Sequence, residues 1–213
     1  MHIEVVDALR CIEPHEETWL VASVEAWHGR QIRTGTLGCP VCRASYPVVN
    51  GVADFTGAAT TAVDGSAAGG APDVDDALRL AALLDLREAG GIVLLAGRHA
   101  ALVDALEAMT AAHYVVLLAP NEAWSGPGSA LRVRERLPFA SASVRAAAVD
   151  GGLAGADLLG QMARVIRPAG RLVAPVGTPV PDEISELARD DRDWVGERQA
   201  ATTPPVALRR RAT

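Results

Sequence analysis

The sequence predicts an α/β protein in which a small β-rich N-terminal segment precedes a doubly wound, mostly parallel sheet. Two observations carry this prediction. Residues 73–213 alternate between helical and strand-like apolar patterns, which is typical of βαβ units. Residues 1–55 instead hold all three cysteines and many β-forming residues, and the Gly-rich residues 56–72 have the composition of a flexible linker. We therefore expect three parts, at residues 1–55, 56–72 and 73–213.

The elements of the second part can be predicted in order. A helix is expected from a cap at Asp73 to the stop at Gly90-Gly91. Continuous apolar runs, typical of buried parallel strands, predict strands at Ile92–Ala96, Tyr114–Ala119, Ala130–Val133, Val144–Val149 and Arg171–Val176. Further helices are expected at His99–Met109, Ala154–Ile166 and Glu183–Ala188. Two short strands, expected to close the sheet as an antiparallel pair, are Trp194-Val195 and Val206–Leu208.

The overall composition excludes several classes of protein. Hydrophobic residues make up 49% of the 213 residues and charged residues 22%, as in a globular protein. The net charge of -6 disfavours a nucleic-acid partner, because phosphate contacts need a basic surface. The first residues lack the pattern of a signal peptide, and no run approaches the ~18 apolar residues of a membrane helix. We therefore expect a cytoplasmic protein with reduced thiols and no membrane partner.

The motif Cys39-Pro-Val-Cys42 places two thiols on a tight turn. A single CxxC motif also occurs in redox proteins, but there it begins a helix, which lowers the thiol pKa. Here the motif lies before the strand-like residues 45–49, which is the setting of a hairpin. The turn is therefore interpreted as half of a metal site.

A second pair of ligand-type residues lies about 24 residues upstream, at Cys11 and His15, with Pro14 favouring a turn between them. Two such pairs are the layout of a zinc ribbon, and four protein ligands leave no open position, so the zinc would be structural. Glu13, His2 or water remain alternatives to His15 as the fourth ligand. The predicted ligands are Cys11, His15, Cys39 and Cys42.

Residues 35–55, GTLGCPVCRASYPVVNGVADF, resemble the zinc-ribbon proteins that activate tRNA and protein methyltransferases. Tyr46-Pro47-Val48 and Gly51-Val52 fall where that family has its Y/F-P-I and G-I steps, whereas Ala53 replaces the usual proline. The resemblance implies a ribbon that adds a strand to the edge of a methyltransferase sheet. It also implies a protein partner, either a methyltransferase or the protein itself.

The second part resembles a class I S-adenosylmethionine-dependent methyltransferase. Leu137-Pro138-Phe139 is similar to the L-P-F before the family's fourth strand, and residues 163–173, ARVIRPAGRLV, are similar to its R-V-L-R-P-G-G-R-L-V. In physical terms, Pro168 and Gly170 end a helix and turn the chain into the next strand. The resemblance therefore implies the fold and does not by itself imply the chemistry.

The positions that hold the cofactor in that family are changed here. Of the glycines in its first loop only Gly97 remains, followed by the bulky Arg98 and His99. Asn121 stands where the family has the acidic residue that binds the ribose, and Arg145 stands where an Asp often opens the fourth strand. Each lost hydrogen bond costs ~1–3 kcal/mol, so three or four losses would weaken a micromolar ligand by roughly 10³-fold or more.

We therefore predict a non-catalytic pseudo-methyltransferase with a structural zinc, acting as a partner, stabiliser or regulator of another protein. Zinc is the one expected cofactor, and no catalytic or cofactor-binding residue is assigned. One alternative is a divergent methyltransferase that still binds S-adenosylmethionine. Another is a different ligand held in the same cleft by Arg98, His99 and Asn121. A weaker one is RNA binding through the ribbon and two arginine clusters, at Arg132, Arg134 and Arg136 and at Arg209, Arg210 and Arg211. The carboxylates at Asp190, Asp191 and Asp193 are interpreted as solvated loop charges.

Overall fold

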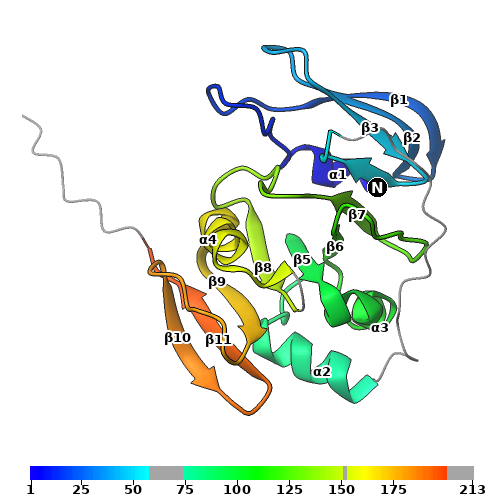
Figure 1. Ribbon diagram of the computed structural model, residues 1–213. Coiled ribbons are helices and arrows are strands. Elements are labelled where there is room, and N and C mark those ends of the chain that lie inside the picture. The colour runs from blue at the N-terminus through cyan, green and yellow to red at the C-terminus, as the bar shows by residue number, and fades with distance from the viewer. Residues whose placement is uncertain (58–73, 151–152, 201–213) are drawn as a thin grey trace, which may run out of the picture.

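The computed structural model describes residues 1–57, 74–150 and 153–200 (Figure 1). The N-terminal part contains the short helix α1 and four strands, which are α1 Ile3–Val6, β1 Val21–His28, β2 Gln31–Gly38, β3 Ser45–Val49 and β4 Val52–Asp54. The remaining strands are β5 Ile92–Ala96, β6 His113–Leu118, β7 Ser129–Arg132, β8 Val144–Ala148, β9 Ile166–Pro175, β10 Ile184–Arg189 and β11 Asp193–Arg198. The remaining helices are α2 Val74–Leu83, the 3₁₀ helix η1 Gly97–Leu102, α3 Val103–Met109 and α4 Ala156–Val165.

One sheet runs through the described residues in the order β1-β2-β3-β4-β7-β6-β5-β8-β9-β11-β10. Neighbours from β4 through β9 are parallel, and the strands on either side of this block are antiparallel. The α/β class, the mostly parallel central sheet and the β-rich N-terminal segment are confirmed. The order reverses direction between β5 and β8, which is the topological switch point of the sheet.

The central strands are apolar because both faces of the sheet are covered. Successive side chains of a strand point to opposite faces, and Leu94 accordingly packs in one core while Val93 and Leu95 pack in the other. Helix α4 covers the first face, and α2 with α3 covers the second (Figure 1). Crossover helices are missing from three described connections, at 119–128, 133–143 and 176–183.

The N-terminal strands join the rest of the molecule through a parallel pair of strands. Val52, Ala53 and Asp54 of β4 lie opposite Ala130, Leu131 and Arg132 of β7. The core on the α4 side is shared, since it includes N-terminal side chains such as Leu37 as well as Leu94 of β5. The β-rich segment therefore extends the sheet of its own chain.

One predicted helix is wrong. Residues 184–189 form strand β10, which pairs with β11 through Ile184↔Arg198 and Ser185↔Glu197. The Glu, Leu and Ala residues of this segment favour helix, but pairing with a neighbouring strand overrides so weak a preference. The strand predicted at Trp194-Val195 lies within β11, which pairs with β9 and β10.

Three parts of the sequence prediction lie outside the described residues. They are the cap at Asp73 with most of the linker 56–72, the strand at Val206–Leu208, and the arginine cluster at 209–211. The boundaries at 1–55, 56–72 and 73–213 accordingly stay predictions. None of the helices in the described part of the chain has the length and apolar character needed to cross a bilayer.

Candidate metal centre and candidate cofactor edge

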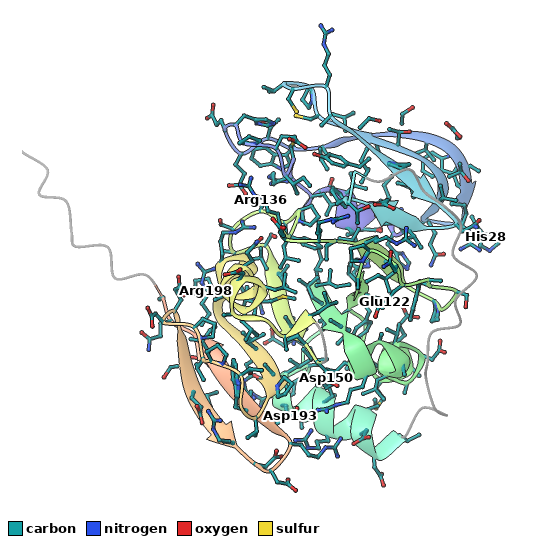
Figure 2. The ribbon with its side chains drawn as sticks, in the orientation of Figure 1. His28, Glu122, Arg136, Asp150, Asp193 and Arg198 are labelled. Carbon is teal, nitrogen blue, oxygen red and sulfur yellow. The ribbon has the colours of Figure 1, made fainter. Side chains whose placement is uncertain are left out.

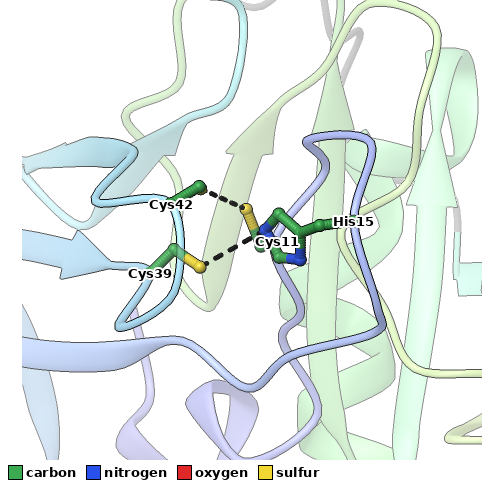
Figure 3. A group of neighbouring side chains, drawn as sticks. All are labelled: Cys11, His15, Cys39 and Cys42. Carbon is green, nitrogen blue, oxygen red and sulfur yellow. Dashed lines mark hydrogen bonds between the residues drawn. The ribbon is translucent and has the colours of Figure 1, made fainter.

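The four predicted metal ligands lie together at the tips of two loops (Figure 3). Their ligand atoms all lie within 4.8 Å of one another. The Sγ atoms of Cys11 and Cys42 are 3.6 Å apart, and Cys39 Sγ is 3.5 Å from His15 Nε2. A tetrahedral zinc site places two sulfur atoms about 3.8 Å apart and sulfur and nitrogen about 3.5 Å apart. The spacing of these side chains therefore fits one tetrahedral ion.

The turn after β2 presents the first two thiols. The backbone N–H of Cys39 donates to Ala44 O over 2.9 Å, and Arg43 N–H donates back to Cys39 O over 3.0 Å. Arg43 adopts φ 64°, the left-handed conformation that closes this turn. Burial raises the pKa of the Cys39 thiol, but hydrogen bonds from the backbone N–H groups of Cys42 and Val41 and from the Cys42 and Cys11 thiols lower it overall to about 6. Burial raises the pKa of the Cys11 thiol to about 11, so Cys39 is the first of this pair to lose its proton. Thiolate is the form of cysteine that binds metals.

The loop between α1 and β1 presents the other two ligands. Cys11 N–H donates to Thr18 O over 3.0 Å, which closes the loop at its base. His15 Nδ1 lies 2.6 Å from Glu16 O, and an N–H donated there leaves Nε2 facing the thiols. Metal-binding histidines commonly donate their second ring N–H in this way, which fixes the ring for binding.

The residues around this cluster connect it to the core. Tyr46 Oη lies 3.3 Å from Cys11 Sγ, and the Tyr46 ring stacks on Phe55 with centroids 4.6 Å apart. Phe55 directly follows β4, the strand that pairs with β7. Three sulfur donors and one imidazole suit a structural zinc, with no ligand position left for substrate. The donors present therefore fit the metal that the sequence predicts.

A buried ion pair, which no sequence motif marks, lies where β4 meets β7. Asp54 Oδ2 is 2.9 Å from Arg132 Nη1, with the two side chains 6% and 11% exposed. Thr56 donates to Asp54 Oδ1 from its backbone N–H over 2.8 Å and from its hydroxyl over 2.6 Å. Arg132 also donates to Glu122 O over 3.0 Å. This pair binds the last residue of β4 to the last residue of β7.

The carboxyl ends of β5 and β8 form the edge where ligands bind in sheets of this type. Arg98, the second residue of η1, lies across this edge, with Nη2 2.5 Å from Asp193 Oδ1 and Nη1 3.4 Å from Asp150 Oδ2. Asp193 also accepts a hydrogen bond from Arg79 Nη1 on α2 over 2.9 Å. The two aspartates lie close together in Figure 2. Interpreting Asp193 as a solvated charge was therefore wrong, because its carboxylate is buried between two guanidinium groups.

The other residues considered for the cofactor position have different surroundings. A Cβ atom on Gly97 would lie 2.6 Å from Asp150 O, because the loops after β5 and β8 are in contact. His99 is buried, and its Nε2 has no hydrogen-bond partner among the described residues. Asn121 is exposed, and the adjacent Glu122 carboxylate accepts the backbone N–H of Ala119 over 2.8 Å.

No known protein-family profile matches the sequence, and no curated protein does. Solved structures with a similar fold include a protein assigned to methyl transfer in an antibiotic biosynthesis pathway of Anabaena variabilis. It is 19% identical with a TM-score of 0.40, over 49% of this chain and 46% of that one. A chain from the complex between the Haloferax volcanii Trm112 methyltransferase activator and its assigned methyltransferase is 13% identical with a TM-score of 0.43, over 58% and 90% of the two chains.

A third similar structure is the geranyl diphosphate C-methyltransferase of Streptomyces coelicolor, solved with Mg²⁺, geranyl-S-thiolodiphosphate and S-adenosyl-L-homocysteine. It is 16% identical with a TM-score of 0.33, over 46% of this chain and 42% of that one. The present chain thus spans less than half the length of the first and third of these proteins.

Proposed function

We propose that the protein is a non-catalytic methyltransferase-like α/β protein whose zinc-binding N-terminal hairpins stabilise the sheet of the same chain. In this proposal it works as a protein partner or regulator, and it does not transfer methyl groups. The zinc would be held by Cys11, His15, Cys39 and Cys42, where it would fix two loops and take no part in a reaction.

The observation that carries the non-catalytic role is the ion cluster at the switch point of the sheet. A cofactor at this edge would need space and polar partners beside the loops after β5 and β8. Instead, Arg98 reaches across the edge to Asp150 and Asp193, and the Gly97 backbone lies against Asp150. Opening a cofactor site here would separate these charges and leave the buried Asp193 with fewer partners, which is costly.

The stabilising role of the N-terminal segment is supported at its junction with the sheet. Strand β4 covers the edge of β7, which would otherwise present unpaired backbone groups. The buried pair of Asp54 and Arg132 lies at the end of this ladder. Tyr46 and Phe55 link the cysteine cluster to β4, so zinc binding would also stabilise the junction between β4 and β7.

Isothermal titration calorimetry with S-adenosylmethionine and S-adenosylhomocysteine tests the non-catalytic role. We expect no saturable heat for the zinc-loaded chain up to about 1 mM ligand, which corresponds to a binding free energy weaker than about -4 kcal/mol. Arg98→Ala removes the guanidinium from the edge and shows whether Arg98 alone blocks the site. A micromolar dissociation constant for the wild-type chain would overturn the proposal in favour of a divergent methyltransferase.

A further inference from the structure

A second group of metal-binding side chains lies away from the cysteine cluster. It consists of His2, Glu4 and His113, whose ligand atoms all lie within 4.8 Å of one another. His2 and Glu4 come from the start of the N-terminal segment, and His113 is the first residue of β6. The group therefore lies at the amino end of the parallel strands, whereas Arg98 lies at their carboxyl end.

The three side chains are partly ordered by other contacts. Arg30 Nε donates to Glu4 Oε1 over 2.5 Å, while Glu4 Oε2 is buried and has no hydrogen-bond partner among the described residues. The backbone N–H of His2 donates to Ser129 Oγ over 2.9 Å, which anchors His2 to the first residue of β7. The His2 and His113 rings are neighbours, with centroids 5.5 Å apart and planes tilted by 47°.

Metal-binding histidines commonly form a hydrogen bond through the ring nitrogen that does not bind the metal, and Gln31 can be that partner for His2. Its side-chain amide lies 3.1 Å from His2 Nε2. The oxygen and nitrogen of such an amide are assigned from their hydrogen bonds, so either atom can face the ring. With the amide oxygen toward Nε2–H, His2 Nδ1 is the unprotonated ring nitrogen, which is the form that binds a metal.

We propose that His2, Glu4 and His113 form a second site for a divalent transition metal such as zinc. Two imidazoles and a carboxylate are ligands that zinc accepts, and the unpartnered Glu4 oxygen would gain a partner. Because all three side chains are only half-buried, water can complete the coordination. A metal here would link the N-terminal segment to β6 by bonds independent of the cysteine cluster.

Zinc titration of the metal-free, untagged full chain tests this site. We expect two equivalents of zinc, one bound tightly and one more weakly. His113→Gln should weaken the second equivalent by roughly 100-fold or more, because loss of outer-shell partners alone costs 10–100-fold. Glu4→Gln should have the same effect. The matched control is His28→Gln, which removes an exposed histidine at the end of β1 (Figure 2) and should leave both equivalents unchanged.

Cobalt(II) distinguishes this proposal from the one about the cysteine cluster. Cobalt bound by the cysteines gives a thiolate charge-transfer band, whereas cobalt at the second site adds only weak visible absorption. A second equivalent that is lost in His113→Gln while the thiolate band remains is the expected result. Saturation by one equivalent, or a second equivalent that survives both His113→Gln and Glu4→Gln, would overturn the second site. Absence of the thiolate band would count only against the cysteine cluster.

Discussion

His99 is a buried imidazole that follows Arg98 in the chain and interacts electrostatically with the ion cluster at the carboxyl edge. Burial, together with the charge of Arg98, lowers its pKa to about 4, with Asp193 and Asp150 opposing the shift and Arg79 adding to it. The ordinary value is 6.5. Between these two pH values the unfolded chain binds a proton that the folded protein does not. Folding stability therefore falls as the pH falls from about 6.5 to about 4.

The variant His99→Gln tests this dependence because it cannot titrate in that range. Between pH 6.5 and pH 5 we expect the wild-type protein to lose about 2 kcal/mol more unfolding free energy than the variant. Urea unfolding of both proteins at the two pH values measures the difference. Comparing them cancels the contribution of carboxylates and of any metal release. Parallel pH profiles would show that the pKa of His99 is the same in the folded and unfolded chains.

The ion pair of Asp54 and Arg132 should contribute to the free energy of unfolding. Asp54→Asn keeps the shape of the side chain and leaves the Arg132 guanidinium buried without its counter-ion, so we expect a loss of about 3 kcal/mol. The matched control is Arg87→Gln, which breaks an ion pair with Asp85 in which the Arg87 side chain is 84% exposed. That control should leave the free energy of unfolding almost unchanged, because solvent screens an exposed ion pair. Equal losses of unfolding free energy in the two variants would show that the buried pair contributes no more to stability than the exposed pair does.

The proximity of single residues was predictable from the sequence only where short, local spacings of the same residue types mark them. The ligand spacing within Cys39–Cys42 and between Cys11 and His15 is local, and the structure brings these four residues together. Asp193 was misinterpreted because its partners Arg79 and Arg98 lie 114 and 95 residues away. No local pattern marks such a contact.

At the scale of elements, the turn that carries Cys39 and Cys42 and strand β4 form a connected unit. Cys39→Ser removes one ligand, and we expect loss of zinc and more frequent local opening of β2–β4 at the edge of β7, in a chain that is less stable as a whole. Hydrogen exchange of residues 46–54 should become roughly 100-fold faster or more, because structural zinc supplies ~10 kcal/mol in zinc-finger peptides. Val41→Ala is the matched control, since Val41 lies exposed in the same turn. A Cys39→Ser protein that keeps its metal and its exchange pattern would refute the zinc ribbon.

Strands were predictable from the sequence where burial on both faces requires an apolar run. They were not predictable where only hydrogen bonding to a neighbouring strand makes the segment a strand. Strand β5 has the bounds expected from its apolar run, because a strand covered on both faces must be apolar throughout. Strand β10 is an outer strand with Leu187 and Glu186 exposed, so its sequence carries no such pattern. Its hydrogen bonds to β11 make it a strand, and the sequence of one segment does not reveal its neighbour.

At the scale of the whole molecule, the N-terminal segment and the α/β sheet share their core. Leu37 of β2 and Leu94 of β5 are both fully buried and belong to the same cluster of apolar side chains. The parallel ladder between β4 and β7 continues the sheet through both parts. The composition suggests two independent domains joined by a linker. Such domains would need neither a shared core nor a strand ladder between them. The two parts should therefore unfold together.

Differential scanning calorimetry of the zinc-loaded protein tests this cooperativity. We expect one transition, lowered as a whole by Leu37→Ala and by Leu94→Ala, because each leaves a cavity costing about 2–5 kcal/mol. For a protein of this size that corresponds to a decrease in Tm of roughly 4–20 °C. The substitutions lie in different parts of the chain, so two independent units would respond separately. A low-temperature transition shifted only by Leu37→Ala, beside a second one shifted only by Leu94→Ala, would show that the shared core does not couple them.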